Sequence, residues 1–384
     1  MKKCCHIVGA RPQFIKYFPV FRATKEYNKK AKKNDVLQDI LIHTGQHYDY
    51  AMSKIFFDEF GLKEPDYHLE VGSGTHGQQT GDILKHTEAV LQQIKPDIVI
   101  VYGDTNTTLG GALAAVKLHI PVAHVEAGLR SFNRHMPEEI NRITTDHISS
   151  LLFCPSKTAV NNLKKEGFEN FFNEGDLCDI HTFNSDNDKK FFNGSVPVVI
   201  NSGDVMYDVF LDARKIAQRK SSILEKLKLQ NKEFGLLTMH RAENTDDIKQ
   251  FLELARFIRS YFKGKSIIFP VHPRIRKRVQ QYKQDFGPDV IMLEPVSYFD
   301  LLMLLEACSF VLTDSGGLQK EAYWAKKPCV TLRNETEWVE TLENGYNILM
   351  SDYKQINKFF ANNNKLYGDG KAADLILRFL NNTI

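Results

Sequence analysis

The sequence predicts an α/β protein built on two doubly wound parallel sheets. Short runs rich in Val and Ile alternate with longer amphipathic stretches along the 384 residues, a pattern typical of parallel strands joined by helices. The runs are apolar on both faces, as expected for strands that helices cover on each side. There are more such runs than one doubly wound sheet comfortably holds, so we expect two sheets of similar size.

The strand and helix signals alternate in both halves of the chain. The predicted strands are 4–9, 38–43, 97–102, 121–125 and 151–154 in the first half, and 234–239, 266–271, 289–293, 309–313 and 328–332 in the second. The clearest helical periods are 77–94, 105–118, 246–264 and 299–307, and a helical stretch at 204–228 separates the halves. Residues 170–200 are rich in Asn and Asp and lack apolar periodicity. We expect them to form a surface insertion, and deletion of 174–201 to leave the fold intact.

The composition excludes several classes of protein. Hydrophobic residues make up 42%, charged residues 25%, and the net charge is only +3, which argues against the large cationic field of a nucleic-acid-binding protein. No apolar run approaches the roughly 20 residues that span a membrane. The six cysteines have no C-x-x-C spacing, so neither a disulfide framework nor a zinc site is predicted. We expect a cytoplasmic protein with no metal and no cofactor.

The strongest local signal is TDSGG at 313–317, where an apolar strand runs into Ser315, Gly316 and Gly317 and then into a helix. Two glycines allow backbone N–H groups to turn toward an anion, and the helix N-terminus adds a partial positive charge. Glu321, one turn further along, is placed to accept both hydroxyls of a ribose. A plain strand-to-helix turn is the alternative for this segment taken alone.

Carboxylates follow the strands of the first half, at the edge where α/β active sites form. Asp104 and Glu126 each come directly after an apolar strand, with His124 expected on the same strand face as Glu126. Glu138 and Glu139 occupy the first turn of a predicted helix, where stabilising the helix dipole is the alternative role for the pair. Three carboxylates from consecutive loops suit general acid/base chemistry at an unactivated carbon.

Basic side chains follow the same kind of strand end in both halves. They are Arg11, Lys16, His240, Arg241, His272, Arg274 and Arg333. Each alone is an ordinary loop charge, but together they predict a site for a dianion such as a nucleotide diphosphate. The literal G-x-G-x-x-G at 72–77 does not predict a dinucleotide site, because it lies outside the first strand–helix turn and no acidic residue ends a strand about 20 residues later.

A series of motifs, in order along nearly the whole chain, resembles the non-hydrolysing UDP-N-acetylglucosamine 2-epimerase family. The motifs are GARPQFIK (9–16), TGQHYD (44–49), GDTNTT (103–108), HVEAGLRS (124–131), PEEINR (137–142), GDVMYD (203–208), MHRAEN (239–244), PVHPR (270–274), TDSGGLQKEA (313–322) and LRNETEW (332–338). The resemblance implies the GT-B fold, two Rossmann-like domains facing a central cleft. It places an N-terminal domain at 1–203 with an insertion at about 173–200, a UDP-binding domain at 204–368, and a C-terminal helix at about 369–384 that packs back on the first domain.

The resemblance also implies a reaction. The family eliminates UDP across C1 and C2 of the sugar to give a 2-acetamidoglucal, then adds UDP back with the C2 proton on the opposite face. By motif position, Asp104, Glu126 and Glu138 would be the acid/base carboxylates, and His240 would assist at the diphosphate leaving group. Arg11 and Lys16 would stabilise phosphate or intermediate, and Ser315, Gly316, Gly317 and Glu321 would hold UDP. The expected UDP-sugar site is completed by His272, Arg274 and Arg333.

Two departures from the family pattern bear on the substrate. Trp338 and Val339 stand where many members have Arg-Pro, and GSGTHGQQTG at 72–81 is similar to a branch that acts on modified UDP-sugars of surface polysaccharides. The expected substrate is therefore UDP-N-acetylglucosamine or a derivative such as UDP-2,3-diacetamido-2,3-dideoxy-glucuronate, and we expect a homodimer. The alternatives are a hydrolysing 2-epimerase, a GT-B glycosyltransferase, and a UDP-sugar sensor without catalysis.

Overall fold

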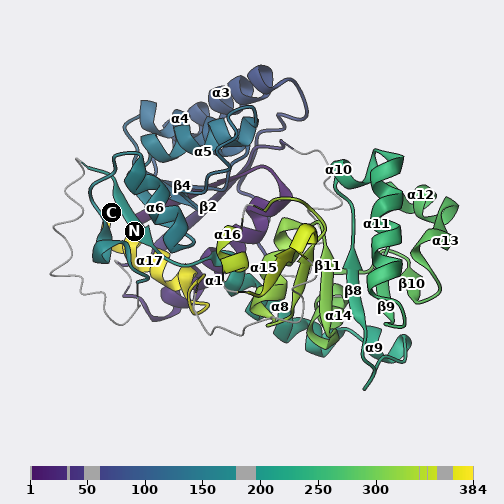
Figure 1. Ribbon diagram of the computed structural model, residues 1–384. Coiled ribbons are helices and arrows are strands. Elements are labelled where there is room, and N and C mark those ends of the chain that lie inside the picture. The colour runs from purple at the N-terminus through teal and green to yellow at the C-terminus, as the bar shows by residue number, and fades with distance from the viewer. Residues whose placement is uncertain are drawn as a thin grey trace. The chain divides into compact units, whose positions relative to one another are not determined.

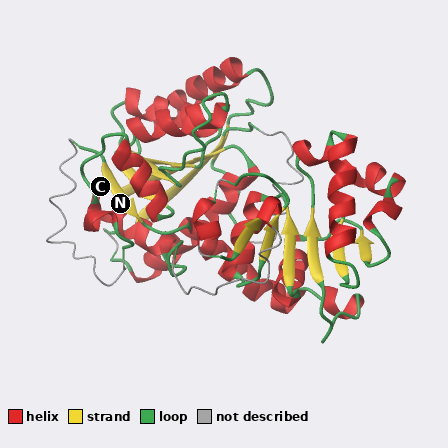
Figure 2. Cartoon of the chain, viewed as in Figure 1, coloured by secondary structure: helices red, strands yellow, loops and turns green. Residues whose placement is uncertain are grey.

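The computed structural model describes residues 2–32, 35–46, 61–178, 196–336, 338–343, 345–352 and 366–383. The chain divides into two compact units (Figure 1): Met1–Val209 with Lys365–Ile384, and Phe210–Asn364. Each unit has its own parallel sheet, with helices between successive strands (Figure 2). The predicted α/β class with two doubly wound parallel sheets is confirmed.

The sheet of the first unit has seven strands in the order β3-β2-β1-β4-β5-β6-β7. Their bounds are β1 Lys2–Val8, β2 Leu37–His43, β3 Tyr67–His68, β4 Ile98–Tyr102, β5 Val122–Val125, β6 Leu151–Cys154 and β7 Val198–Asn201. The strand order reverses between β1 and β4, and this switch point is where parallel α/β sheets bind ligands at their carboxyl edge.

The helices of the first unit cover both faces of its sheet. They are α1 Arg11–Lys30, α3 His76–Ile94, α4 Asn106–Lys117, α5 Pro137–Ile148, α6 Lys157–Lys165, the short η1 Phe172–Gly175 and α17 Ala372–Thr383, while α8 Val205–Lys220 crosses the division between the units. Because side chains alternate along a strand, Ile7 and Val101 pack in the core with α3 and α4, whereas His6 and Tyr102 contact Tyr17 of α1. Figure 1 shows α3, α4 and α5 on one side of the sheet and α1 and α17 on the other.

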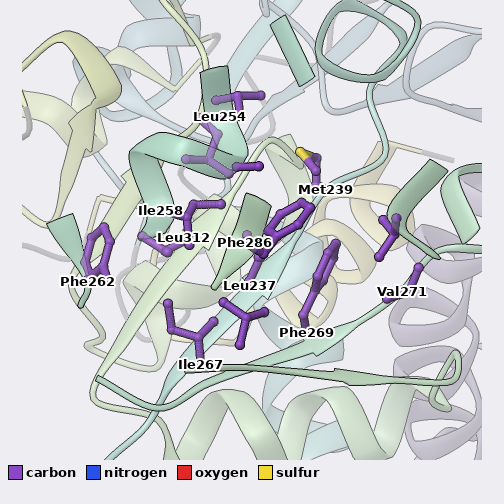
Figure 3. Packing of buried hydrophobic residues seen from close by; sticks show 14 of the residues in the cluster. Leu237, Met239, Leu254, Ile258, Phe262, Ile267, Phe269, Val271, Phe286 and Leu312 are labelled. Carbon is purple, nitrogen blue, oxygen red and sulfur yellow. The ribbon is translucent and has the colours of Figure 1, made fainter. Parts of the chain in front are cut away.

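The second unit repeats the same strand order, β10-β9-β8-β11-β12-β13. Its strands are β8 Gly235–Thr238, β9 Ile267–Pro270, β10 Val290–Leu293, β11 Phe310–Thr313, β12 Cys329–Thr331 and β13 Asn347–Leu349. Its helices are α9 Ile223–Lys226, α10 Ala242–Thr245, α11 Ile248–Tyr261, η3 Pro273–Ile275, α12 Arg276–Gln281, α13 Lys283–Phe286, α14 Tyr298–Ala307, α15 Gly316–Trp324 and α16 Val339–Glu343. In the core of this unit, Leu237, Phe269 and Leu312 from three strands pack with Leu254 and Ile258 of α11 (Figure 3). The switch point here lies between β8 and β11.

The segment 170–200 is not a surface insertion throughout, which corrects the expectation from the sequence. Phe172 is buried and meets Phe379 of α17 edge to face, with ring centroids 4.8 Å apart. Val198–Asn201 forms β7, a wholly buried strand paired with β6. Residues 179–195 lie outside the described residues. Deletion of 174–201 would remove this strand of the sheet, so we now expect the deletion to destabilise the fold.

Most of the cysteines lie in the cores of the two units. Cys4, Cys5, Cys154, Cys308 and Cys329 are buried thiols that form no disulfide. Burial raises the pKa of Cys4 and of Cys308 to about 12, so these thiols stay protonated near neutral pH and are poor nucleophiles. Among the described residues, no helix combines the length and the apolar character needed to cross a membrane.

Candidate active site

A buried ion pair lies at the carboxyl edge of the first sheet, next to its switch point. Lys16 Nζ is 2.6 Å from Glu126 Oε1, and the two side chains are only 11% and 10% exposed. Burial works to lower the pKa of Lys16, but Glu126 and Asp104 raise it above its ordinary value, so the ammonium is charged. Gly103 packs against the pair, since a Cβ there would lie 3.0 Å from Lys16 Nζ and 3.5 Å from Glu126 Oε1. Helix α1 and the loops after β4 and β5 therefore meet at one place.

Asp104 follows that glycine and is held by α5. Arg142 donates to Asp104 Oδ2 from Nε at 3.0 Å, and its Nη2 is 2.9 Å from the same oxygen. Asn141 Nδ2 donates to the Asp104 carbonyl at 2.9 Å. The Asp104 side chain remains 31% exposed. Its carboxylate is thus oriented by a cation and still open to solvent, as a proton-transfer group requires.

The two adjacent glutamates of α5 differ sharply. Glu139 is 1% exposed and accepts hydrogen bonds from the Ser131 backbone and hydroxyl and from the Phe132 backbone, at 2.9–3.0 Å. Burial works to raise the pKa of Glu139, but these bonds and Arg142 hold it below its ordinary value. Glu138 is exposed in the first turn of α5. Glu139 therefore fixes the preceding loop, and Glu138 is the carboxylate of the pair that a ligand can reach.

His124 and Glu126 do not share a strand face, which corrects the expectation from the sequence. Strand β5 ends at Val125 and Glu126 has φ of 75°, so the alternation of side chains along the strand stops before Glu126. His124 is wholly buried, and Glu126 turns to Lys16. Arg11, also predicted for the site, is the exposed first residue of α1.

In the second unit, Asp314 organises the loop that carries His240. Asp314 is fully buried and accepts hydrogen bonds from the backbone N–H of His240 at 3.0 Å and of Arg241 at 3.0 Å, and from Asn244 Nδ2 at 3.1 Å. The His240 ring is 38% exposed, with Nδ1 3.5 Å from Asp314 Oδ1. It stacks on His272, with ring centroids 5.4 Å apart. Burial, followed by the proximity of His240, lowers the pKa of His272, which favours its neutral form.

The TDSGG turn forms the start of α15. Ser315 is the N-cap residue, and its Oγ accepts a hydrogen bond from the Leu318 N–H at 3.5 Å. Gly316 and Gly317 are the first two helical residues, whose N–H groups have no partner within a helix. Glu321, one turn on, is 8% exposed and accepts a hydrogen bond from the Tyr298 hydroxyl at 2.8 Å. Burial raises the pKa of Glu321 to about 7.

The two predicted arginines of this unit line different pockets. Arg333 is largely buried, with Nε 3.8 Å from Glu243 Oε2, and both line a pocket of about 370 Å³. Arg274 donates from Nη2 to both carboxylate oxygens of Asp246 at 2.8 and 2.9 Å, and both residues line a pocket of about 290 Å³. The remaining predicted residues of this unit lie on the loops after β8, β9 and β11 and on α15.

Three organising residues escaped the sequence analysis. Arg142 lies three positions after Glu139 on a helix, and that spacing was the available signal because such side chains share a face. Asp314 directly follows the apolar strand β11 and precedes Ser315. Asp146 gave no local signal, because its partner His124 lies 22 positions earlier. In the part of the chain that the structure describes, no group of three or more His, Cys, Asp or Glu side chains is placed to hold a metal ion.

Comparison with known proteins identifies the family. The model of the family described as UDP-N-acetylglucosamine 2-epimerase matches residues 29–381. A UDP-N-acetylglucosamine 2-epimerase homolog of Methanococcus maripaludis is 46% identical over 99% of both chains. The UDP-2,3-diacetamido-2,3-dideoxy-D-glucuronate 2-epimerase of Pseudomonas aeruginosa is 42% identical over 98% of this chain and 99% of its own.

Solved structures agree with these relatives. The Methanocaldococcus jannaschii UDP-GlcNAc 2-epimerase, solved in complex with UDP-GlcNAc and UDP, is 40% identical with a TM-score of 0.75, covering 99% of both chains. The Neisseria meningitidis UDP-GlcNAc 2-epimerase, solved bound to UDP-GlcNAc, is 28% identical with a TM-score of 0.76, also over 99% of both chains. The resemblance inferred from the motifs and the GT-B fold class are confirmed. With its two Rossmann-like parallel sheets, the chain belongs to the UDP-N-acetylglucosamine 2-epimerase family of isomerases.

Proposed function

We propose that this chain inverts C2 of a UDP-N-acetylhexosamine by eliminating UDP and adding it back. The observation that carries the proposal is the meeting of Lys16, Glu126 and Asp104 around Gly103. Inversion at C2 needs one group to remove a proton and another to deliver one from the opposite face. Glu126 and Asp104 lie at the same carboxyl edge of the sheet, beside Lys16 and Arg142 respectively, and could supply such a pair.

The proposed steps use acidic and basic side chains of the first unit. One carboxylate takes the C2 proton while the C1–O bond breaks and the electron pair leaves with the β-phosphate of UDP, giving the 2-acetamidoglucal. In the return step, the diphosphate oxygen attacks C1 and a carboxylate on the other face protonates C2. Glu126 and Asp104 are the principal pair, and Glu138 is the third acid. Lys16 and Arg11 stabilise the charge that develops on phosphate.

The second unit is proposed to hold UDP. The free N–H groups expected at the start of α15, at Gly316 and Gly317, suit a phosphate. Glu321 is placed to accept ribose hydroxyls, and His240 to assist the departing diphosphate. His272, Arg274 and Arg333 remain proposed contacts of the UDP-sugar. The two arginines would contact it in the pockets that they line.

The substrate is proposed to be UDP-N-acetylglucosamine or a modified derivative. The 42% identity to the Pseudomonas aeruginosa enzyme favours including UDP-2,3-diacetamido-2,3-dideoxy-glucuronate. Incubation of the purified protein with both nucleotides and with 6-deoxy analogues, followed by proton NMR of the C2 configuration, identifies the substrate. Free UDP that accumulates to the level of product would instead support the hydrolysing alternative.

The mechanism is tested in D₂O. Product formed by elimination and re-addition carries deuterium at C2, because the proton comes from a group that exchanges with solvent. A bridging ¹⁸O label also scrambles into non-bridging positions of the β-phosphate, because the C1–O bond breaks. Product without C2 deuterium would contradict the proposal.

A further inference from the structure

His124 lies at the centre of a buried hydrogen-bond network beneath the predicted carboxylates. Its side chain is fully buried. Its Nε2 is 2.7 Å from the carbonyl oxygen of Gly103, and its Nδ1 is 2.6 Å from Asp146 Oδ1. One ring thus bridges the end of β4 and helix α5.

Both partners of the ring are acceptors. A backbone carbonyl oxygen has no proton to give, so Nε2 must donate to Gly103. Asp146 is ionised: Oδ2 accepts from the Gly128 N–H at 3.1 Å and lies 2.7 Å from Arg130 Nη1. Burial works to raise the pKa of Asp146, but His124 and Arg130 hold it below its ordinary value. An ionised carboxylate only accepts, so Nδ1 must donate as well, and a ring that donates on both sides is an imidazolium.

The charges around the ring balance. Arg130 also donates from Nε and Nη2 to both oxygens of Glu166, at 2.7 and 2.8 Å. Two cations, His124 and Arg130, therefore face two anions, Asp146 and Glu166. Cys154 on the neighbouring strand is buried and its pKa is raised well above the ordinary value by burial, so that group is neutral. A buried cation needs such pairing to be tolerated.

The network joins the three segments that carry the three proposed acids. Gly103 immediately precedes Asp104, His124 lies two residues before Glu126, and Asp146 is on the same helix as Glu138. The Gly103 turn also packs against the Lys16–Glu126 pair. A shift of the Gly103 carbonyl would therefore move both the Asp104 backbone and the turn that packs against Glu126.

We propose that His124 is a doubly protonated positioning residue, whose two N–H bonds set the spacing of Asp104, Glu126 and Glu138. The protonation state rests on the hydrogen-bond geometry around the ring and on the ionised Asp146, while the effect on turnover rests on the proposed function. A neutral ring would leave either the Gly103 carbonyl or the Asp146 carboxylate without its buried donor, and the turn would relax.

The charge of the ring is measured directly by NMR of the full chain with ¹⁵N-labelled histidine near neutral pH. Long-range proton–nitrogen correlations should show both ring nitrogens of His124 protonated, with its signals assigned by their loss in His124→Gln. His6 is the internal control. It is a buried histidine of the same sheet, and burial lowers its pKa, so it should show one protonated and one bare nitrogen. The same neutral pattern at His124 would overturn the proposal.

The positioning role is measured by turnover. His124→Gln should lower kcat about 10²-fold with little change in KM, the size expected when reacting groups are displaced by about 1 Å. The matched control His6→Gln removes an equally buried ring and should change kcat by no more than several-fold. Equal kcat for His124→Gln and wild type would overturn the role.

Asp146→Asn provides a second variant that keeps the ring. It should abolish the doubly protonated pattern and lower kcat. Retention of both ring protons with normal turnover would contradict the proposal. If the wild-type protein epimerises no UDP-sugar, the proposed function fails, whereas the NMR result on His124 still stands or falls by itself.

Discussion

The carboxyl edges of the two sheets are built by the same topology but charged in different ways. In the first unit, three acids of this edge each have a cation beside them: Lys16 for Glu126, and Arg142 for Glu139 and Asp104. In the second unit, Glu321 is buried against a tyrosine hydroxyl and its pKa rises to about 7. The first edge is thus preorganised for ionised carboxylates, whereas the second presents backbone N–H groups and a carboxyl that a ligand can complete. This difference suits proton transfer at one edge and nucleotide binding at the other.

The largest effect is expected at the paired carboxylates of the first unit. Asp104→Asn and Glu126→Gln should each lower kcat by about 10²–10⁴-fold, because each removes a general acid or base. Turnover of UDP-N-acetylhexosamine is followed by NMR, together with deuterium entry at C2. Near-normal turnover in both variants would remove these two residues from the mechanism.

The next prediction distinguishes a structural glutamate of α5 from a proposed catalytic one. Glu139→Gln should lower the free energy of unfolding by about 1.5–3 kcal/mol, because it weakens charged hydrogen bonds to a buried loop. Since the pKa of Glu139 is lowered on folding, this contribution is present above the unfolded-state pKa and is lost as the pH falls through the folded value. Denaturant unfolding measures it.

Glu138→Gln is the matched control, since that side chain is exposed. It should change stability by no more than about 0.5 kcal/mol and should instead lower turnover. The opposite outcome, with Glu139→Gln stable and Glu138→Gln unstable, would reverse the two assignments.

In the second unit, Glu321→Ala should weaken UDP binding by about 1.5–3 kcal/mol, the value of hydrogen bonds to a charged group. Tyr298→Phe is a milder control that removes one hydroxyl beside the same carboxyl and should cost about 1 kcal/mol. Calorimetric titration with UDP gives both values. Unchanged affinity in Glu321→Ala would exclude this residue from the nucleotide site.

A further effect is the pH dependence of stability at Glu321. A carboxyl with a raised pKa binds its proton more tightly when folded, so the free energy of unfolding should fall as the pH rises from 4.5 to about 7. The slope should be shallower in Glu321→Gln, which cannot ionise. Identical slopes in the two proteins would mean that Glu321 is ionised throughout this range.

Most strands and the long helices could be predicted from periodicity, because they are long enough to show it. The first-unit segment Ile98–Tyr102 is buried at every position, and so it reads as a continuous apolar run. Strands β3 and β13 have two and three residues, too few for any period. Strand β7 is not distinguished from the preceding insertion in the sequence. It has only four residues and follows an Asn-rich stretch.

The sequence by itself determined the fold class, the family and the strand ends at which chemistry-bearing residues occur, because these depend on local patterns and ordered motifs. Only the tertiary structure decided which of these residues are buried, which are exposed and which partners they bind. Glu138 and Glu139 are identical in sequence terms, yet α5 exposes one and buries the other. His124 acquires its second acceptor only from Asp146, 22 residues later. Charge state and burial depend on contacts between distant segments, and such contacts leave no local trace in the chain.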